Sequence, residues 1–248
     1  ALWSSTDRGT VTMPWAINPN LSDRIRPFFE YAFRTRTARD HFIAGDSGAG
    51  YVNPSQLLPP RDPSGLPGAV EAWQRHCRRY YQRFGYTMTG FLINGRAGQI
   101  PAEAERMYLP FSPDGVVNQY GLSHASVHLE EDRLPVWVMS SDLSGDLDRD
   151  TTTVHALAET TEPPTARFLV FRTILQPVSY IAALNAELER TRPDLNYTFC
   201  DPGTFSRLTR AHFDGDNKDI ATWLFDTAPE VMVAGQEYEF EAAVRNDG

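Results

Sequence analysis

Three aspartates directly follow predicted β-strands, at the end of a parallel sheet where functional side chains gather. They are Asp46, Asp142 and Asp201. Asp142 is the first choice, because it comes after the strongest predicted strand, residues 136–139. Two carboxyl groups at such positions, one protonated and one ionised, could hydrolyse a glycosidic bond.

Each aspartate also has an ordinary structural explanation. Asp46 could cap a turn, and Asp142 could be solvated in its loop or cap the following helix. For Asp201 the helix N-cap is the stronger interpretation, because Pro202 follows at once.

Other polar and aromatic residues at predicted strand ends could hold a sugar. Amides and cations would orient its hydroxyl groups, and aromatic rings would stack on its apolar face. The aromatic candidates are Tyr51 and Trp15. The polar candidates are Asn18, Asn53, Asn94, Arg96, Asn118, Gln119 and Arg172. The alternatives are that Arg172 pairs with a core carboxylate and that Trp15, next to Pro14, only packs.

No sequence pattern predicts a metal or a cofactor. Asp146-x-Asp148-x-Asp150 begins like a calcium loop, but Thr151 replaces the expected glycine and no glutamate stands at the twelfth position. The histidines form no HxH or HExxH motif, which disfavours a metal-assisted deacetylase, and the residues around His128 indicate a loop. A GxSxG elbow, a P-loop and a dinucleotide fingerprint are also missing, so we expect no cofactor.

The elements that must position these residues alternate between strand and helix. Such alternation predicts an α/β fold with a mainly parallel sheet. Helices are expected near residues 25–33, 70–84, 177–190 and 202–208, with Pro27 in the first turn of the first and Gly85 as the left-handed cap of the second. Strands are expected at residues 12–17, 42–44, 88–93, 116–118, 136–139, 168–171 and 196–199. These seven candidates fall short of the eight units of a complete barrel, and the pattern alone does not separate an open sheet from a barrel.

Composition limits the partners. A formal net charge of −9 disfavours nucleic acid, and an aromatic content of 12% suits neutral sugars. There is no apolar run of eighteen residues, so no membrane span is expected. Cys77 and Cys200 are interpreted as two buried thiols.

The chain changes character near residue 213. We expect residues 1–213 to form the α/β domain and residues 214–248 a linker followed by β-rich sequence. Residues 237–241 alternate with period two, which is typical either of an opening immunoglobulin-like sandwich or of an edge strand. The ends of the sequence favour a piece of a longer polypeptide with additional domains.

The most distinctive segment is Gly48-x-Gly50-Tyr51-x-Asn53-Pro54. It resembles the motif of the GxGYxYP family, whose members are proposed to be glycoside hydrolases. A strand with proline and tryptophan at residues 13–17 and the turn at residues 201–205 are similar to that family in the same order, so the resemblance covers about residues 3–212. Two features depart from the family: Asn53 stands in place of its second tyrosine, and its acidic Ser-Asp-Gly-Asp-Asn strand end is absent.

The resemblance implies a β/α barrel-like core, either complete or lacking one unit, that hydrolyses an extracellular polysaccharide or oligosaccharide through paired carboxylates. It also implies a secreted protein, extracellular or periplasmic. The two departures leave an alternative open, a non-catalytic module that binds glycans or serves as a scaffold.

Overall fold

The structure of the chain, a computed structural model, describes residues 2–61, 64–94, 98–121, 127–159 and 167–214, and the backbone of 221–226 and 242–246. Contacts divide the chain into two compact units, Ala1–Arg210 and Ala211–Gly248. This division lies close to the expected boundary at residue 213. The domain assignments themselves remain predictions.

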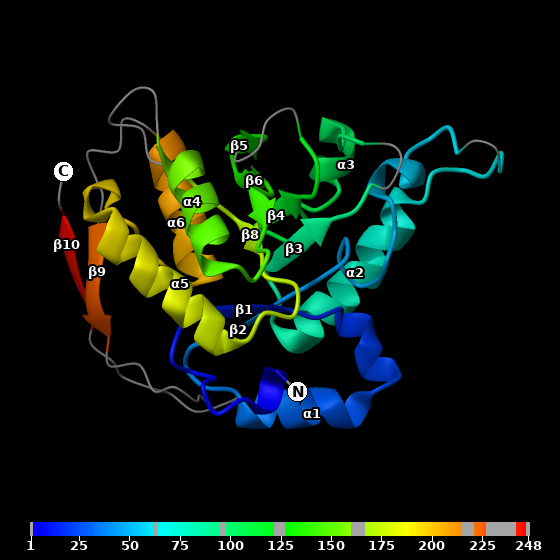
Figure 1. Ribbon diagram of the computed structural model, residues 1–248. Helices are drawn as coiled ribbons and strands as arrows, with labels where there is room; N and C mark the ends of the chain where they lie inside the picture. The colour runs from blue at the N-terminus through cyan, green and yellow to red at the C-terminus, as the bar shows by residue number, and fades with distance from the viewer. Residues whose placement is uncertain are drawn as a thin grey trace. The chain divides into compact units, whose positions relative to one another are not determined.

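Parallel strands form the framework of the first unit (Figure 1). Strand β1 (Met13–Ala16) pairs in parallel with β2 (Asp40–Ile43). A second sheet has the order β3 (Met88–Leu92), β4 (Gly115–Asn118), β6 (Leu134–Val138) and β5 (Val127–Glu130), of which only β5 is antiparallel to its neighbour. The two-residue strands β7 (Ser141–Asp142) and β8 (Phe171–Arg172) form a short parallel pair.

Backbone contacts connect these sheets edge to edge. A parallel bridge joins Ala44, after β2, to Thr89 of β3. At the other side, the Ser140 amide donates to the Val170 carbonyl at 2.8 Å. The parallel strands therefore follow chain order with their carboxyl ends toward one edge, which confirms the mainly parallel α/β prediction. The described strands form separate sheets and no closed barrel, so the barrel part of the prediction remains unconfirmed.

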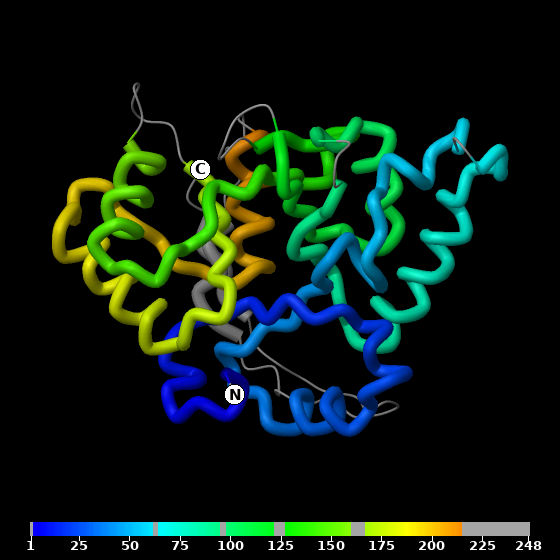
Figure 2. Tube along the Cα trace, turned by 45° about the vertical axis from the view of Figure 1, so that its right-hand side comes forward, coloured from blue at the N-terminus to red at the C-terminus, as the bar shows by residue number. Residues whose placement is uncertain are grey.

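Helices connect the strands of this unit. They are α1 (Arg26–Thr35), α2 (Val70–Phe84), α3 (Ala102–Arg106), α4 (Leu147–Ala158), α5 (Val178–Thr191) and α6 (Pro202–Phe213). Short 3₁₀ turns lie at Leu2–Ser4, Pro19–Asp23, Pro54–Leu57 and Pro193–Leu195. Helices α4 and α5 run side by side in both views (Figures 1 and 2) and bury Leu143, Val154, Leu184 and Leu188 together.

Helix α2 shows how local sequence fixes an element. Its apolar stripe, Trp73, Cys77, Tyr80 and Tyr81, is buried as the helical period predicts. The helix ends at Gly85, whose φ of 67° is the left-handed conformation that glycine adopts without a Cβ clash. The stripe packs into the main core with residues of β3, β4 and β6.

Three local predictions are wrong. Residues 196–199 form no strand, because the 3₁₀ turn Pro193–Leu195 ends in a left-handed Asn196 that turns the chain away from extended pairing. The strand expected at residues 168–171 covers only Phe171–Arg172. Helix α4 begins at Leu147 with Asp146 as its N-cap. His128 lies in strand β5 rather than in a loop.

The second unit contains β9 (Ala221–Asp226), which pairs antiparallel with β10 (Ala242–Asn246). The alternating segment at residues 237–241 lies outside the described residues. Whether the pair opens an immunoglobulin-like sandwich therefore stays a prediction.

Candidate functional site

An ion pair at the carboxyl ends of β7 and β8 is the centre of the candidate site. Asp142 and Arg172 are register partners of the two strands, so their side chains leave the sheet together. Arg172 Nε donates to Asp142 Oδ1 at 2.7 Å, and Nη2 donates to Oδ2 at 2.6 Å. This two-pronged geometry fixes the plane of the carboxylate, while the Asp142 side chain stays 46% exposed. Asp142 is thus oriented and still accessible to a ligand.

The surroundings of Arg172 connect the ion pair with the ends of other strands. The hydrogen bond to Asp142 raises the pKa of Arg172, although burial acts in the opposite direction. Tyr120, after β4, and Asp46, after β2, are near enough to add to this rise. The guanidinium carbon also lies 5.6 Å from the centre of the Phe91 ring in β3. Arg172 therefore lies within electrostatic reach of three strand ends.

Asp46 belongs to the same edge and is held by the end of β1. Asn18 Nδ2 donates to Asp46 Oδ2 at 3.0 Å. The backbone is left-handed at Asp46 and at Ser47, with φ of 41° and 70°, and such strained loops are frequent at functional sites. The structure thus brings together four of the predicted site residues, Asn18, Asp46, Asp142 and Arg172. We call these four residues the strand-end cluster.

Sequence reasoning missed two aromatic neighbours of this cluster. Phe91 lies under the guanidinium, and Tyr120, which is half exposed, could stack on a sugar ring. Tyr120 could have been found, since it directly follows Asn118 and Gln119 at a predicted strand end. For Phe91, inside its strand, the sequence holds no comparable signal.

The glycine motif builds a tight loop after β2. The Ser47 amide donates to the Phe91 carbonyl at 2.8 Å, and the Tyr108 hydroxyl donates to the Ser47 carbonyl at 2.7 Å. The next residues lie against α2, where His76 Nε2 is 2.9 Å from the Ala49 carbonyl oxygen. Tyr51 projects from this loop with 70% of its surface exposed. The loop is anchored to the core, and Tyr51 is available for contact with a ligand.

Several predicted binding residues have structural partners instead. Asn94 is buried, and its Oδ1 accepts from the Ser55 hydroxyl at 2.6 Å. Trp15 donates to Asp40 Oδ1 at 2.8 Å, away from the strand-end cluster. Asn118 is buried and donates to Glu105.

Three predicted binding residues remain. Asn53 precedes the 3₁₀ turn Pro54–Leu57 without a capping side-chain bond. The backbone amide of Gln119 donates to the Leu92 carbonyl, which is a main-chain hydrogen bond between the ends of β4 and β3. Arg96 lies outside the described residues.

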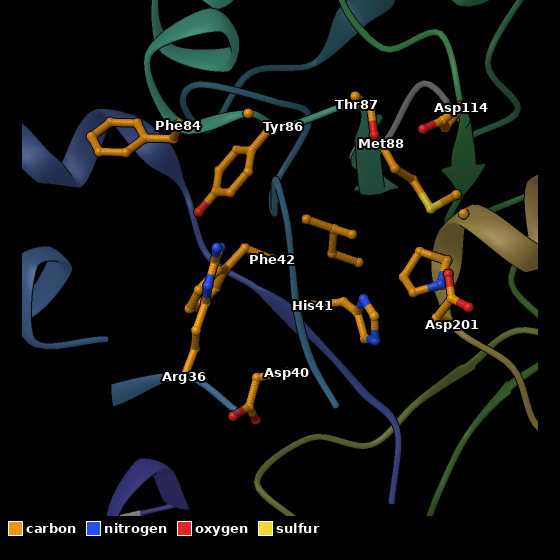
Figure 3. Close-up of a pocket in the computed structure, with 14 residues that line it drawn as sticks. Arg36, Asp40, His41, Phe42, Phe84, Tyr86, Thr87, Met88, Asp114 and Asp201 are labelled. Atoms are coloured by element: carbon orange, nitrogen blue, oxygen red, sulfur yellow. The ribbon is translucent and has the colours of Figure 1, made fainter. Parts of the chain in front are cut away.

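Asp201 is a helix cap, and it lies away from the other two aspartates. Its Oδ1 accepts from the Thr204 amide at 2.9 Å at the start of α6. Burial would raise the pKa of Asp201, but the bonds from Thr204 lower it below the ordinary value. Asp201 lines a cavity of about 280 Å³ together with Asp40 and Met88, which begin β2 and β3 (Figure 3). This cavity lies at the amino ends of the strands and contains no residue of the strand-end cluster.

Two parts of the structure are relevant to metal binding, Asp150 and a cluster on α3 and β5. Asp150, from the calcium-like stretch, is buried and accepts from Ser144, Gly145 and the Tyr180 hydroxyl, so it holds the start of α4. Among the residues that the structure describes, Glu105, His128 and Glu130 form a group whose ligand atoms could share an ion.

Comparisons with known proteins agree with this fold. The model of the family described as "GxGYxYP putative glycoside hydrolase C-terminal domain" matches residues 1–183. The structure of a putative hydrolase from Bacteroides thetaiotaomicron VPI-5482 is similar, with a TM-score of 0.63 and 15% sequence identity, which shows the fold. The similarity covers 85% of this chain and 41% of that protein. A search of curated proteins found no match.

Proposed function

This chain belongs to the GxGYxYP family, in the region of its putative glycoside hydrolase C-terminal domain, and from that premise we propose that it hydrolyses glycosidic bonds at the strand-end cluster. The observation that carries the proposal is the carboxylate of Asp142, held by two hydrogen bonds from Arg172, together with Asp46 after the carboxyl end of β2, which Asn18 holds. Two carboxyl groups near one cation, with exposed tyrosines close by in sequence or space, form the type of surface that a saccharide requires.

The two carboxyl groups have different environments. Asp142 accepts two hydrogen bonds from the Arg172 guanidinium, which hold its carboxylate in a fixed plane beside a cation. Asp46 accepts one hydrogen bond, from the neutral amide of Asn18. In this proposal the two aspartates share the roles of acid and of base or nucleophile.

One observation favours the alternative, a glycan-binding module without catalysis. Both oxygens of Asp142 already accept from Arg172, and a carboxylate tied in this way serves to position a ligand as well as to react with it. In this alternative Tyr51, Tyr120 and the strand-end cluster hold a glycan, and no bond is cleaved.

We place this activity outside the cytoplasm, on polysaccharide or oligosaccharide, as the family resemblance implies. The chain spans 41% of the length of its structural neighbour, so we also propose that further domains of the same polypeptide contribute to the substrate site. No helix in the described part of the chain is long and apolar enough to cross a membrane.

The test compares Asp142→Asn and Asp46→Asn with the unchanged full-length protein on a panel of polysaccharides. Asp148→Asn is the matched control, because Asp148 is an exposed aspartate in the first turn of α4, the helix that follows Asp142. Release of reducing sugar that both site variants lose and the control keeps supports hydrolysis. Retention of a polysaccharide in affinity electrophoresis without release supports the binding module. Neither retention nor release, or release that survives both site substitutions, refutes the proposal.

A further inference from the structure

A second cluster of ionisable side chains lies between helix α3 and strand β5. Glu105 comes from α3, and His128 and Glu130 come from β5. Residues two apart on a strand project from the same face, so His128 and Glu130 face α3 together. One ligand atom from each of the three residues lies within 4.8 Å of those of the other two.

We propose that Glu105, His128 and Glu130 bind a divalent transition-metal cation, with Zn²⁺ as the best fit. One imidazole nitrogen and two carboxylate oxygens form a mixed set that suits Zn²⁺ and is unusual for Mg²⁺ or Ca²⁺, which prefer oxygen alone. Ligands at about 2.0–2.2 Å from a tetrahedral zinc lie roughly 3.3 Å from one another. The observed spacing therefore needs only a small closure by flexible glutamate side chains.

Asn118 is the independent observation that points to a ligand here. It is only 3% exposed, and its Nδ2 donates to Glu105 Oε1 at 2.5 Å, so its amide ends at the cluster. Its Oδ1 is buried and accepts no hydrogen bond from any described residue. An amide that bonds to a ligating carboxylate orients that carboxylate for the metal.

The accessibility of the three side chains agrees with an ion that enters from solvent. The Glu105 side chain is 5% exposed and that of Glu130 12%, whereas the His128 ring is 47% exposed. A buried carboxylate, a partly buried one and a more open imidazole leave room for water or a ligand at the fourth position.

The competing explanation is a plain ion pair. His128 Nε2 lies 2.9 Å from Glu105 Oε2, and Arg106 lies 3.2 Å from Glu130. These contacts would satisfy the charges without a metal. The two explanations differ in what they predict for metal binding, and that difference does not depend on whether the protein hydrolyses glycans.

The experiment measures metal binding to the untagged full-length protein after treatment with EDTA and dialysis. We expect isothermal titration with ZnCl₂ to give one equivalent at micromolar affinity or tighter, and Co²⁺ to give a visible absorption band. His128→Asn and Glu130→Gln should each weaken Zn²⁺ binding at least tenfold. Glu103→Gln should leave it unchanged, because Glu103 lies on the same helix with an exposed side chain.

Circular dichroism of each variant separates loss of a ligand from loss of the fold. Glu105→Gln should also weaken Zn²⁺ binding, and if this variant does not fold, His128→Asn and Glu130→Gln still test the proposal. Absence of Zn²⁺ binding by the unchanged protein overturns the proposal. Equal affinities in the folded His128→Asn, Glu130→Gln and Glu103→Gln variants also overturn it, because the bound metal would then lie elsewhere.

Discussion

Replacing Gly48 by alanine tests whether the first glycine of the family motif is required for packing. The φ of Gly48 is +123°, a conformation that residues with a Cβ rarely adopt. An added Cβ would lie 3.2 Å from Cys77 Sγ, 3.4 Å from a ring carbon of Trp73 and 3.5 Å from the Tyr81 hydroxyl. All three side chains are buried on α2, so the methyl group has little space.

The expected destabilisation has two parts. A strained backbone costs about 1–3 kcal/mol, and forcing an extra carbon into a packed core costs about 1–3 kcal/mol. Gly48→Ala should therefore lower the free energy of unfolding by roughly 2–6 kcal/mol, a large share of the ~5–15 kcal/mol typical of a domain.

Urea denaturation followed by circular dichroism measures this difference. Gly65→Ala is the matched control, because Gly65 also has a positive φ, +62°, but nothing lies within 4 Å of its would-be Cβ. The control carries the backbone strain alone and should cost about 1 kcal/mol. If Gly48→Ala is no more destabilising than Gly65→Ala, the glycine is not required for packing against α2.

Three further predictions concern single ionisable groups. Asp40→Asn should lower the free energy of unfolding by about 3 kcal/mol, measured by urea denaturation, because it leaves the largely buried guanidinium of Arg8 without its charged partner. Burial would raise the pKa of Asp40, but hydrogen bonds from Thr37, Trp15 and Arg8 lower it, so its stabilising effect is complete above about pH 4 and is lost as the pH falls through the lowered value. As the pH falls below 5, the Asp40→Asn variant should therefore lose less of its free energy of unfolding than the unchanged protein. An equal loss contradicts this assignment. Burial raises the pKa of Cys77 to about 12, so a thiol reagent at pH 8 should modify it only after denaturation, and rapid labelling in the native state would contradict its burial.

The secondary structure was predictable where its signals are local. Helix α2 is specified by a stripe of four apolar residues and a terminal glycine, all within one stretch of chain. The prediction of a strand at residues 196–199 failed because a strand needs a partner, and apolar residues alone do not supply one. Strand β5 was missed for the converse reason. Its pairing with β6 depends on contacts that its own sequence does not reveal.

The candidate site was predictable only as far as parallel strands align their carboxyl ends. That rule selected Asn18, Asp46, Asp142 and Arg172, and the register of β7 with β8 explains why the last two meet. The same rule selected Asn94, which is buried and bonds Ser55 rather than joining the strand-end cluster. An amide at a strand end serves equally well to bond the neighbouring loop, as Asn94 does with Ser55, and sequence does not separate the two uses.

Glu105 is a residue of the proposed metal site that the sequence did not reveal. Glu105 lies outside the predicted strand ends, in the five-residue helix α3, and it is buried against Asn118. The orientation of a helix this short is set by the strands β4 and β5, whose residues Asn118 and His128 contact Glu105. A carboxylate in such a turn carries no sequence signal of burial. The pair His128-x-Glu130 also gave no sequence signal. Two possible ligands on one strand face indicate a metal site only when the fold places a third ligand, from another element, beside them.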